Sequence, residues 1–296
     1  MNRHVETPVP LDQLERIESV AVELANLAGA EIVSALGGIF TVRYKTGATE
    51  SALWRDPVSE VDRKVETLIR ARLAENFPDH DIIGEEMNER PSRDSEFVWA
   101  VDPIDGTSNF INGFPMFAAS VGVLHRCRPV VGAVWCAASH ALRAGVYHAR
   151  AGGKLRFDGS NVTPKANPSV RSRLAGVPLV KAEDLPWETR KTGSAAIECA
   201  LVAAGLLQVS RFSNPNIWDV AGGLALVQAA GGVIWEKHGE TWRPMRRFEP
   251  AKKGPDDEPD LRFWRRSIVI GAAEAVERMC SPPKPIEKKA PEIAGT

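Results

Sequence analysis

Three short acidic motifs, each placed where a predicted strand or loop meets a turn or a helix start, constrain the fold of this chain more than any other feature. They are Gly-Glu-Glu at 84–86, Asp-Pro-Ile-Asp-Gly-Thr at 102–107 and Trp-Asp-Val-Ala-Gly-Gly at 218–223. Carboxylates gathered by a fold bind hard cations such as Mg2+, which prefer oxygen ligands. A site that holds two or more Mg2+ ions most often handles phosphate. The motifs therefore predict a reaction type more sharply than a substrate.

The hydrophobic pattern alternates between helix-like and strand-like segments. Apolar residues recur at three-to-four spacing in the predicted helices, which cover 11–36, 59–76, 195–204 and 219–231. Strand-like runs cover 39–45, 80–83, 96–101, 118–124, 130–136, 145–148, 233–237 and 267–271. This alternation predicts a layered α/β or α+β domain. Residues 281–296 are rich in Pro, Lys and Glu, which predicts a disordered tail.

Composition excludes several classes of protein. The net charge is -1 and no apolar run approaches the ~20 residues of a membrane span, so neither a membrane nor nucleic acid is an expected partner. Residues 1–10 lack the pattern of a secretory signal, and the four cysteines lack zinc-site or redox spacing. We therefore expect a cytoplasmic protein with reduced thiols. Two basic-aromatic clusters, 242–248 and 262–266, fit either an acidic partner or solvated arginines packed on aromatic rings.

The motif at 102–107 has the clearest chemistry. Pro103 forces Asp102 into an extended conformation, so we expect Asp102 at the end of the strand 96–101. A turn at Pro103 and Gly106 then swings Asp105 back beside Asp102. Two carboxylates so close repel each other unless a cation lies between them. Gly106 and Thr107 offer N–H groups to a phosphate oxygen, and the alternative is an ordinary Asp-Pro turn.

Each of the other acidic residues also has a structural alternative. Glu85 and Glu86 suit a solvated loop, and Asp219 suits a helix N-cap. Asp62 lies three residues after Ser59 and suits a capping-box pair. The small residues at 221–223 permit close approach of another backbone, which fits a crowded site.

Taken together, the motifs resemble those of the inositol monophosphatase family of Mg2+-dependent, lithium-sensitive phosphatases. The similarity lies in residues 84–86, 99–110 with 113–115, 193–196 and 218–222, and its order and spacing extend over roughly 12–275. The resemblance implies a sandwich of alternating α-β-α-β-α layers and a homodimer. It also implies one catalytic domain over 1–280, with a metal-site half over about 1–150 and a second half over about 151–280.

The resemblance also implies roles for individual residues. Two to three Mg2+ ions are expected, and their ligands would be Glu85, Asp102, the Ile104 carbonyl, Asp105 and Asp219. The catalytic residues would be Glu85, Thr107 and Asp62, with Asp62 and Thr107 as a pair and Glu85 and Thr107 orienting the attacking water. The substrate would contact Asp105, Gly106, Thr107, Gly193, Ser194, Ala195, Arg211 and Asp219. No Gly-x-Ser-x-Gly elbow or P-loop competes with this interpretation.

Inositol-1-phosphate is the substrate that the resemblance favours. The family usually carries a glutamate seven residues before the motif aspartate, whereas this chain has Phe212 there, preceded by Arg211. Arg211 suggests a second anionic group on the substrate. Fructose-1,6-bisphosphate, a 3′(2′),5′-bisphosphate nucleotide and histidinol phosphate therefore stay open as substrates. A non-catalytic binding or regulatory protein on the same fold is the alternative from another class.

Overall fold

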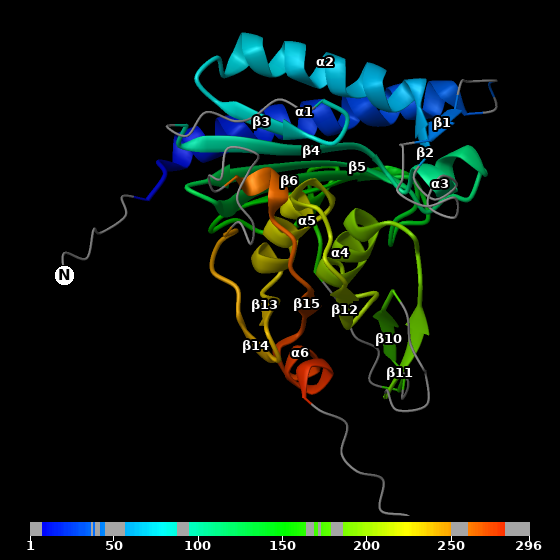
Figure 1. Cartoon of the computed structure of the whole chain (residues 1–296), viewed down its shortest axis with the longest axis vertical. Coiled ribbons are helices and arrows are strands. Elements are labelled where there is room, and N and C mark those ends of the chain that lie inside the picture. Colours follow the sequence, from blue (N-terminus) through cyan, green and yellow to red (C-terminus); the bar gives the residue numbers. More distant parts are fainter. Residues whose placement is uncertain are drawn as a thin grey trace, which may run out of the picture.

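Two β-sheets separated by helices organise the chain (Figure 1). The structure is a computed structural model that describes residues 8–36, 38, 42–44, 57–87, 95–163, 169–170, 173–178, 186–249 and 260–281. The helices are α1 (Leu11–Ala35), α2 (Glu60–Asn76), α3 (Thr107–Ile111), α4 (Ala195–Ala203), α5 (Ile217–Ala229), α6 (Ala273–Cys280) and the 3-10 turn η2 (Leu261–Phe263).

The larger sheet has seven strands in the order β3-β4-β5-β6-β7-β8-β9, and only the β3–β4 pair is parallel among them. These strands are β3 (Asp81–Gly84), β4 (Phe97–Asp105), β5 (Ala118–His125), β6 (Arg128–Cys136), β7 (Gly145–Arg150), β8 (Arg156–Phe157) and β9 (Ser160–Asn161). A separate short pair joins β1 (Val42–Tyr44) to β2 (Pro57–Ser59).

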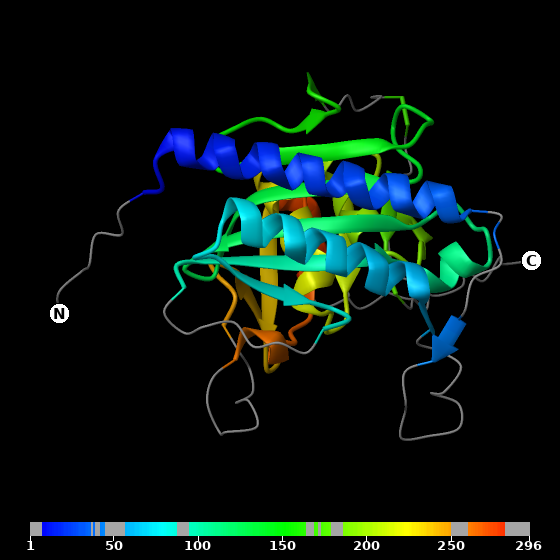
Figure 2. The same ribbon diagram turned by 90° about the horizontal axis from the view of Figure 1, so that it is seen from above.

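The smaller sheet has six strands in the order β11-β10-β12-β15-β13-β14. They are β10 (Arg173–Gly176), β11 (Trp187–Arg190), β12 (Val209–Phe212), β13 (Val233–His238), β14 (Thr241–Pro244) and β15 (Ile268–Gly271). Helices α1 and α2 cover the outer face of the larger sheet, α4 and α5 lie between the sheets, and α6 lies beyond the smaller sheet (Figures 1 and 2). The predicted α-β-α-β-α layering is confirmed.

Strand β4 shows why the larger sheet is buried on both faces. Its residues Val98 and Ala100 pack in the core between the two sheets, while Trp99 and Val101 pack against α1 and α2. Burial of each large apolar side chain stabilises the fold by roughly 1.5–3 kcal/mol. The indole N–H of Trp99 donates to His80 Nδ1 at 3.0 Å, so this large ring is buried without an unpaired donor.

Helix α5 approaches the larger sheet through glycines, as the small residues at 221–223 predicted. A Cβ on Gly122 or Gly132 would collide with the backbone of Gly222, and a Cβ on Gly223 would collide with Cys199 of α4. This close approach holds α5 beside β5. Asp219, near the start of α5, therefore faces the end of β4 that carries Asp102 and Asp105, which is the acidic end of β4. The packing of glycine on glycine therefore helps to build the site.

Several predicted boundaries require correction. Strand β4 runs through Asp102 to Asp105 instead of ending at Asp102, because a bulge takes up the turn-forming residues without ending the pairing with β5. Helix α5 begins at Ile217 and not at Asp219, because Asn216 caps it. Helices α3 and α6 and strands β12 and β14 were not predicted. The predicted loop at 46–56 and the tail at 282–296 lie outside the described residues.

Candidate active site

The bulged end of β4 places two aspartates at the edge of the larger sheet. Asp102 is 2% exposed, and its Oδ1 accepts a hydrogen bond from the backbone N–H of Ile104 at 3.1 Å. Pairing with β5 shifts register between Asp102 and Asp105. The bulge thus turns the chain so that both carboxylates lie near the junction with α3.

Asp105 connects this edge to α4. Its Oδ2 accepts hydrogen bonds from Ser194 Oγ at 2.7 Å and from the Ala196 N–H at 2.5 Å. Ser194 is the N-cap of α4, and its Oγ also accepts from the Ile197 N–H. The positive end of α4 therefore faces a carboxylate, which is the favoured arrangement for a helix N-terminus. Gly106, at φ 91°, permits the close approach, because a Cβ there would lie 3.3 Å from Ser194 Cβ.

Asp219 lies in the first turn of α5 as the third residue of a capping box. Its Oδ2 accepts from the Asn216 backbone N–H at 2.8 Å and from Asn216 Nδ2 at 3.2 Å. The alternative role of Asp219 as N-cap is therefore wrong: Asn216 is the N-cap, and Asp219 completes the capping pair. The carboxylate stays partly exposed toward the acidic end of β4.

Glu85 follows β3, in a loop held by residues that the motifs did not reveal. The Glu85 N–H donates to the Val101 carbonyl at 3.2 Å, which continues the β3–β4 ladder into the acidic motif. Two side chains, Glu66 of α2 and Arg262 of η2, also bond this loop. Charged residues at these positions have no local motif, so sequence patterns gave no signal for them.

Asp62 and Thr107 form the pair that the resemblance implied. Asp62 is 1% exposed on α2, and Thr107 Oγ1 lies 3.2 Å from Asp62 Oδ1 and 2.9 Å from the Ile104 carbonyl. The side chain of Ser59, the expected capping partner of Asp62, lies outside the described residues. The contact with Thr107 places Asp62 next to the bulged end of β4.

The carboxylates of the site repel one another. Burial, then the charges of Glu85, Asp105 and Asp219, raise the pKa of Asp102 well above its usual range. Burial and Asp219 likewise raise the pKa of Asp105, against the bonds from Ser194 and Ala196. Burial raises the pKa of Asp219 to about 7, although Asn216 opposes the shift. These side chains come from three distant parts of the sequence and share one electrostatic environment.

The donor set suits Mg2+, although the side chains do not yet form a cage. No group of three or more His, Cys, Asp and Glu side chains among the described residues is arranged as a ready metal site. Asp105 is hydrogen-bonded to Ser194 of the α4 N-terminus, and Asp219 is hydrogen-bonded to Asn216. Carboxylate and carbonyl oxygens are the ligands that Mg2+ prefers, and a cation would offset both the burial and the repulsion that raise these pKa values. The residues present therefore fit a divalent ion.

Arg211 is not brought to this site. It lies on β12 with its guanidinium 5.5 Å from the centroid of the Trp242 ring. Trp242 packs in the small core that faces α6, whereas Phe212, the next residue along β12, is buried in the core that contains α4 and α5. The side chain of Arg211 therefore points to the opposite face of the smaller sheet from Phe212, and the substrate contact expected for it stays a prediction.

Two further polar residues support the turn at 192–194. Glu198 of α4 accepts from the backbone N–H and the hydroxyl of Thr192, at 3.2 and 2.9 Å. Asn109 of α3 donates from Nδ2 to the carbonyls of Thr192 and Met116. Together they hold Gly193 and Ser194 against Gly106. Both are ordinary polar helix residues in the sequence, so only their spatial neighbours identify them.

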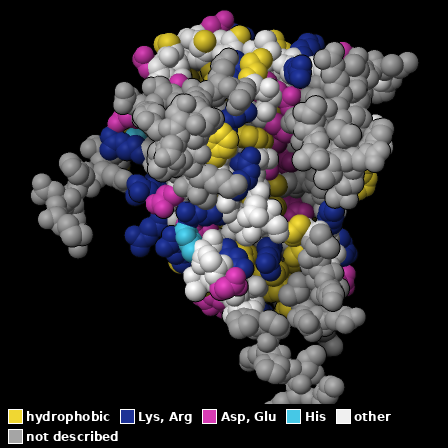
Figure 3. All heavy atoms as spheres, viewed as in Figure 1, with side chains coloured by type: hydrophobic (Ala, Val, Ile, Leu, Met, Phe, Trp, Pro, Cys, Tyr) yellow, Lys and Arg dark blue, Asp and Glu magenta, His cyan; other side chains and the backbone are white. Residues whose placement is uncertain are grey.

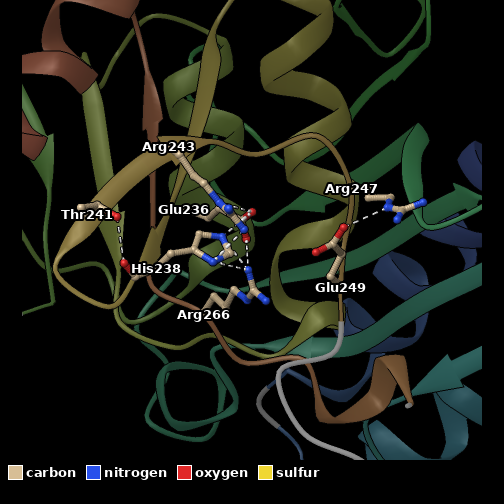
Figure 4. A network of polar contacts seen from close by, with 7 residues as sticks. All are labelled: Glu236, His238, Thr241, Arg243, Arg247, Glu249 and Arg266. Atoms are coloured by element: carbon tan, nitrogen blue, oxygen red, sulfur yellow. Dashed lines mark hydrogen bonds and ion pairs between the residues drawn. The ribbon is translucent and has the colours of Figure 1, made fainter. Parts of the chain in front are cut away.

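The basic-aromatic clusters largely consist of internally paired arginines. Figure 3 shows Lys and Arg side chains gathered around a histidine over β13 and β14. Arg266 bonds Glu236 at 3.2 Å and the ring of His238, and Arg243 Nη2 lies 2.8 Å from His238 Nδ1 (Figure 4). Arg247 bonds Glu249 at 3.1 Å. Arg262 and Arg265 pack on the ring of Trp218, as the expectation of arginines on aromatic rings predicted, whereas Arg243, Arg247 and Arg266 bond acidic or histidine side chains.

Solved structures with the same fold are readily found. A Bartonella henselae extragenic suppressor protein suhB aligns with a TM-score of 0.67 at 22% identity, over 91% of this chain and 97% of that chain. A Thermotoga maritima IMPase aligns with a TM-score of 0.65 at 24% identity, over 91% of this chain and 95% of that chain. No helix in the described part of the chain has the length and apolarity required to cross a membrane.

The fold and the comparisons define a layered α/β phosphatase, a phosphoric monoester hydrolase. The model of the inositol monophosphatase family matches residues 13–256, and the chain belongs to this family. The "Fructose-1,6-bisphosphatase/inositol-1-monophosphatase" of Aquifex aeolicus is 32% identical over 75% of this chain and 86% of its own length. The "Probable inositol 1-monophosphatase ImpA" of Mycobacterium tuberculosis is 31% identical, with 81% and 92% covered.

Proposed function

We propose that this phosphatase uses Mg2+ to hydrolyse a small phosphate monoester, with inositol-1-phosphate as the leading substrate. The observation that carries the proposal is that the fold gathers Asp102, Asp105 and Asp219 at the junction of β4, α4 and α5, where burial and mutual repulsion raise their pKa values. Carboxylates gathered away from solvent destabilise a fold, so their presence together argues for a cation that they bind.

Two to three Mg2+ ions would be held by Glu85, Asp102, the Ile104 carbonyl, Asp105 and Asp219. When bound, Mg2+ lowers the pKa of a water molecule and neutralises charge on the phosphoryl group and the leaving oxygen. Lithium sensitivity, as in the family that the motifs resemble, belongs to the same proposal.

The proton of the Thr107 hydroxyl determines how this residue acts. One hydroxyl donates a single hydrogen bond, here to Asp62 Oδ1 or to the Ile104 carbonyl, and keeps lone pairs to accept from water. Thr107 would therefore accept a hydrogen bond from the attacking water, with Glu85 as a second hydrogen-bond acceptor. Asp62 would fix the direction of the hydroxyl, so that the water approaches phosphorus along one line.

The phosphate would be bound by backbone donors. We assign this role to the N–H groups of Gly106 and Thr107 and to the start of α4 at Gly193, Ser194 and Ala195. Helix α4 starts with its positive end toward the carboxylate cluster, where it would also favour a phosphate oxygen. Asp105 and Asp219 lie where they would meet both the metal and the substrate.

The choice among esters depends on groups beyond the phosphate. Phe212 is 7% exposed and packs in the core, so it offers no acceptor to an inositol hydroxyl. The name of the Aquifex aeolicus relative favours fructose-1,6-bisphosphate as the second candidate. A bisphosphate nucleotide, histidinol phosphate and a non-catalytic binding role remain outcomes of the test. We further propose a cytoplasmic location and a homodimer.

Phosphate release from a panel of these esters, with and without Mg2+, tests the proposal. We expect turnover that requires Mg2+ and is lost in Asp102→Asn. The exposed aspartate at the start of α1 provides the control Asp12→Asn, which should behave as the wild type. If no ester is hydrolysed but ligands raise the melting temperature, the protein binds and does not catalyse. Turnover by Asp102→Asn at the wild-type rate would refute the site.

A further inference from the structure

Two charged side chains, far apart in sequence, hold the loop that carries Glu85. Glu66 of α2 accepts hydrogen bonds from the backbone N–H groups of Glu86 at 2.7 Å and Met87 at 3.2 Å. Arg262 of η2 donates to the carbonyl of Gly84 at 2.7 Å and, less closely, to that of Glu85 at 3.4 Å. The loop 84–87 is therefore bonded through its N–H groups on one side and its carbonyls on the other.

Glu66 bonds the loop 84–87 from a position inside the protein. Its side chain is fully buried, and Arg70, one turn later on α2, reaches it at 2.8 Å. A Cβ on Gly84 would collide with the Glu66 carboxylate, so a larger residue at the first position of the loop would displace that carboxylate. A buried carboxylate is costly unless hydrogen-bond donors surround it, and here two backbone N–H groups and one guanidinium do so.

Arg262 reaches the loop from the C-terminal part of the chain. Asp260 caps η2 and so fixes the backbone from which Arg262 extends. The guanidinium lies 5.1 Å from the centroid of the Trp218 ring. Trp218 is 6% exposed and immediately precedes Asp219 on α5. Arg262 therefore contacts both the Glu85 loop and the residue next to Asp219.

We propose that Arg262 is a positioning residue that sets the separation between Glu85 and Asp219, with Glu66 fixing the opposite side of the Glu85 loop. This inference rests on the proposed function, in which both carboxylates are Mg2+ ligands. Arginine suits the role because one planar guanidinium both donates two parallel hydrogen bonds and stacks on an aromatic ring. Lysine offers a point charge and would restore only part of the geometry.

The Mg2+ affinity measured by calorimetry, independently of turnover, tests the proposal. Arg262→Met keeps a long side chain but removes the donors, and we expect its Mg2+ affinity to fall about tenfold or more, as is typical when residues behind metal ligands are lost. Arg262→Lys should recover part of the loss, and Glu66→Gln should weaken Mg2+ binding in the same direction. The Mg2+ concentration for half-maximal turnover should rise in parallel, while the KM for the ester at saturating Mg2+ changes little.

Arg266→Lys is the matched control, because Arg266 lies in the same segment and bonds Glu236 and His238 instead of the loop. Wild-type Mg2+ affinity in Arg262→Met would overturn the positioning role and leave the proposed function intact. An equal loss in Arg266→Lys would show general destabilisation of the segment and would also overturn it. A wild-type protein that binds no Mg2+ would instead refute the proposed function, before any variant is compared.

Discussion

Buried carboxylates are neutralised differently in two regions of this molecule. On the smaller sheet, Glu236 is paired with Arg266 and with His238, and its side chain is 6% exposed. At the acidic end of β4, no described lysine, arginine or histidine forms an ion pair with Asp102, Asp105 or Asp219. Both regions contain acids that lie largely out of solvent, but among the described residues only Glu236 has Arg and His side chains in direct ion pairs with it; Arg265 acts on Asp219 through its charge without such a pair. The difference supports our proposal that the acidic end of β4 binds a cation from solution.

The largest effect on activity should come from removing a charge at the acidic end of β4. Asp219→Asn is expected to lower kcat/KM by more than about a hundredfold, since loss of groups behind metal ligands alone costs about 10–100-fold. The variant should keep the wild-type fold because asparagine retains an acceptor for the Asn216 N–H. Phosphate release at saturating Mg2+, with circular dichroism as the check on folding, measures this.

Glu236→Gln should have the opposite effect on the protein, with a loss of stability and little loss of activity. It leaves Arg266 and His238 without their carboxylate, so the free energy of unfolding should fall by about 1–3 kcal/mol. Activity should stay within about twofold of the wild type. A large loss of activity with unchanged stability would show that the two regions do not differ as we describe.

The sequence predicted the acidic end of β4 better than it predicted the smaller sheet. In residues 102–107, proline, glycine and paired aspartates at fixed spacing predicted a change of chain direction and a carboxylate site, although the change is a bulge within β4 and not a turn after it. Gly222 and Gly223 likewise predicted the close packing of α5 against its neighbours. Strands β12 and β14 lack such a pattern: each has only four residues, β12 is mostly buried and pairs with strands far away in the sequence, and β14 is mostly exposed. Glu66 and Arg262 act through tertiary contacts, so no local pattern could reveal them.

The stability of the Mg2+-free protein should depend on pH through Asp219 at the acidic end of β4. The pKa of Asp219 is raised to about 7, above its value near 4 in an unfolded chain, so the folded Mg2+-free protein binds more protons than the unfolded one between these values. The contribution of Asp219 to stability is therefore present at pH 4 and is lost as the pH rises through about 7.

Urea unfolding without Mg2+ at pH 5 and pH 8 measures this loss. Asp219→Asn should reduce the decline between the two pH values, whereas Mg2+ should reverse it in the wild type. At a Mg2+ concentration 100 times its Kd, binding would add about 2.7 kcal/mol to the free energy of unfolding. An equal decline in stability in wild type and Asp219→Asn would show that Asp219 is not the group responsible for it.

The smallest effect is expected at Arg211, and it tests whether the smaller sheet contributes a substrate contact. The guanidinium stacks on Trp242 on the face toward α6, so Arg211→Ala should lower the free energy of unfolding by only about 0.5–1 kcal/mol. The KM for each hydrolysed ester should stay within about twofold of the wild type. Trp242→Ala should cause a similar or larger loss of stability, because it removes the ring as well as the stack. A KM that rises for bisphosphates alone in Arg211→Ala would place the guanidinium at the substrate and would overturn its assignment to the far face of the sheet.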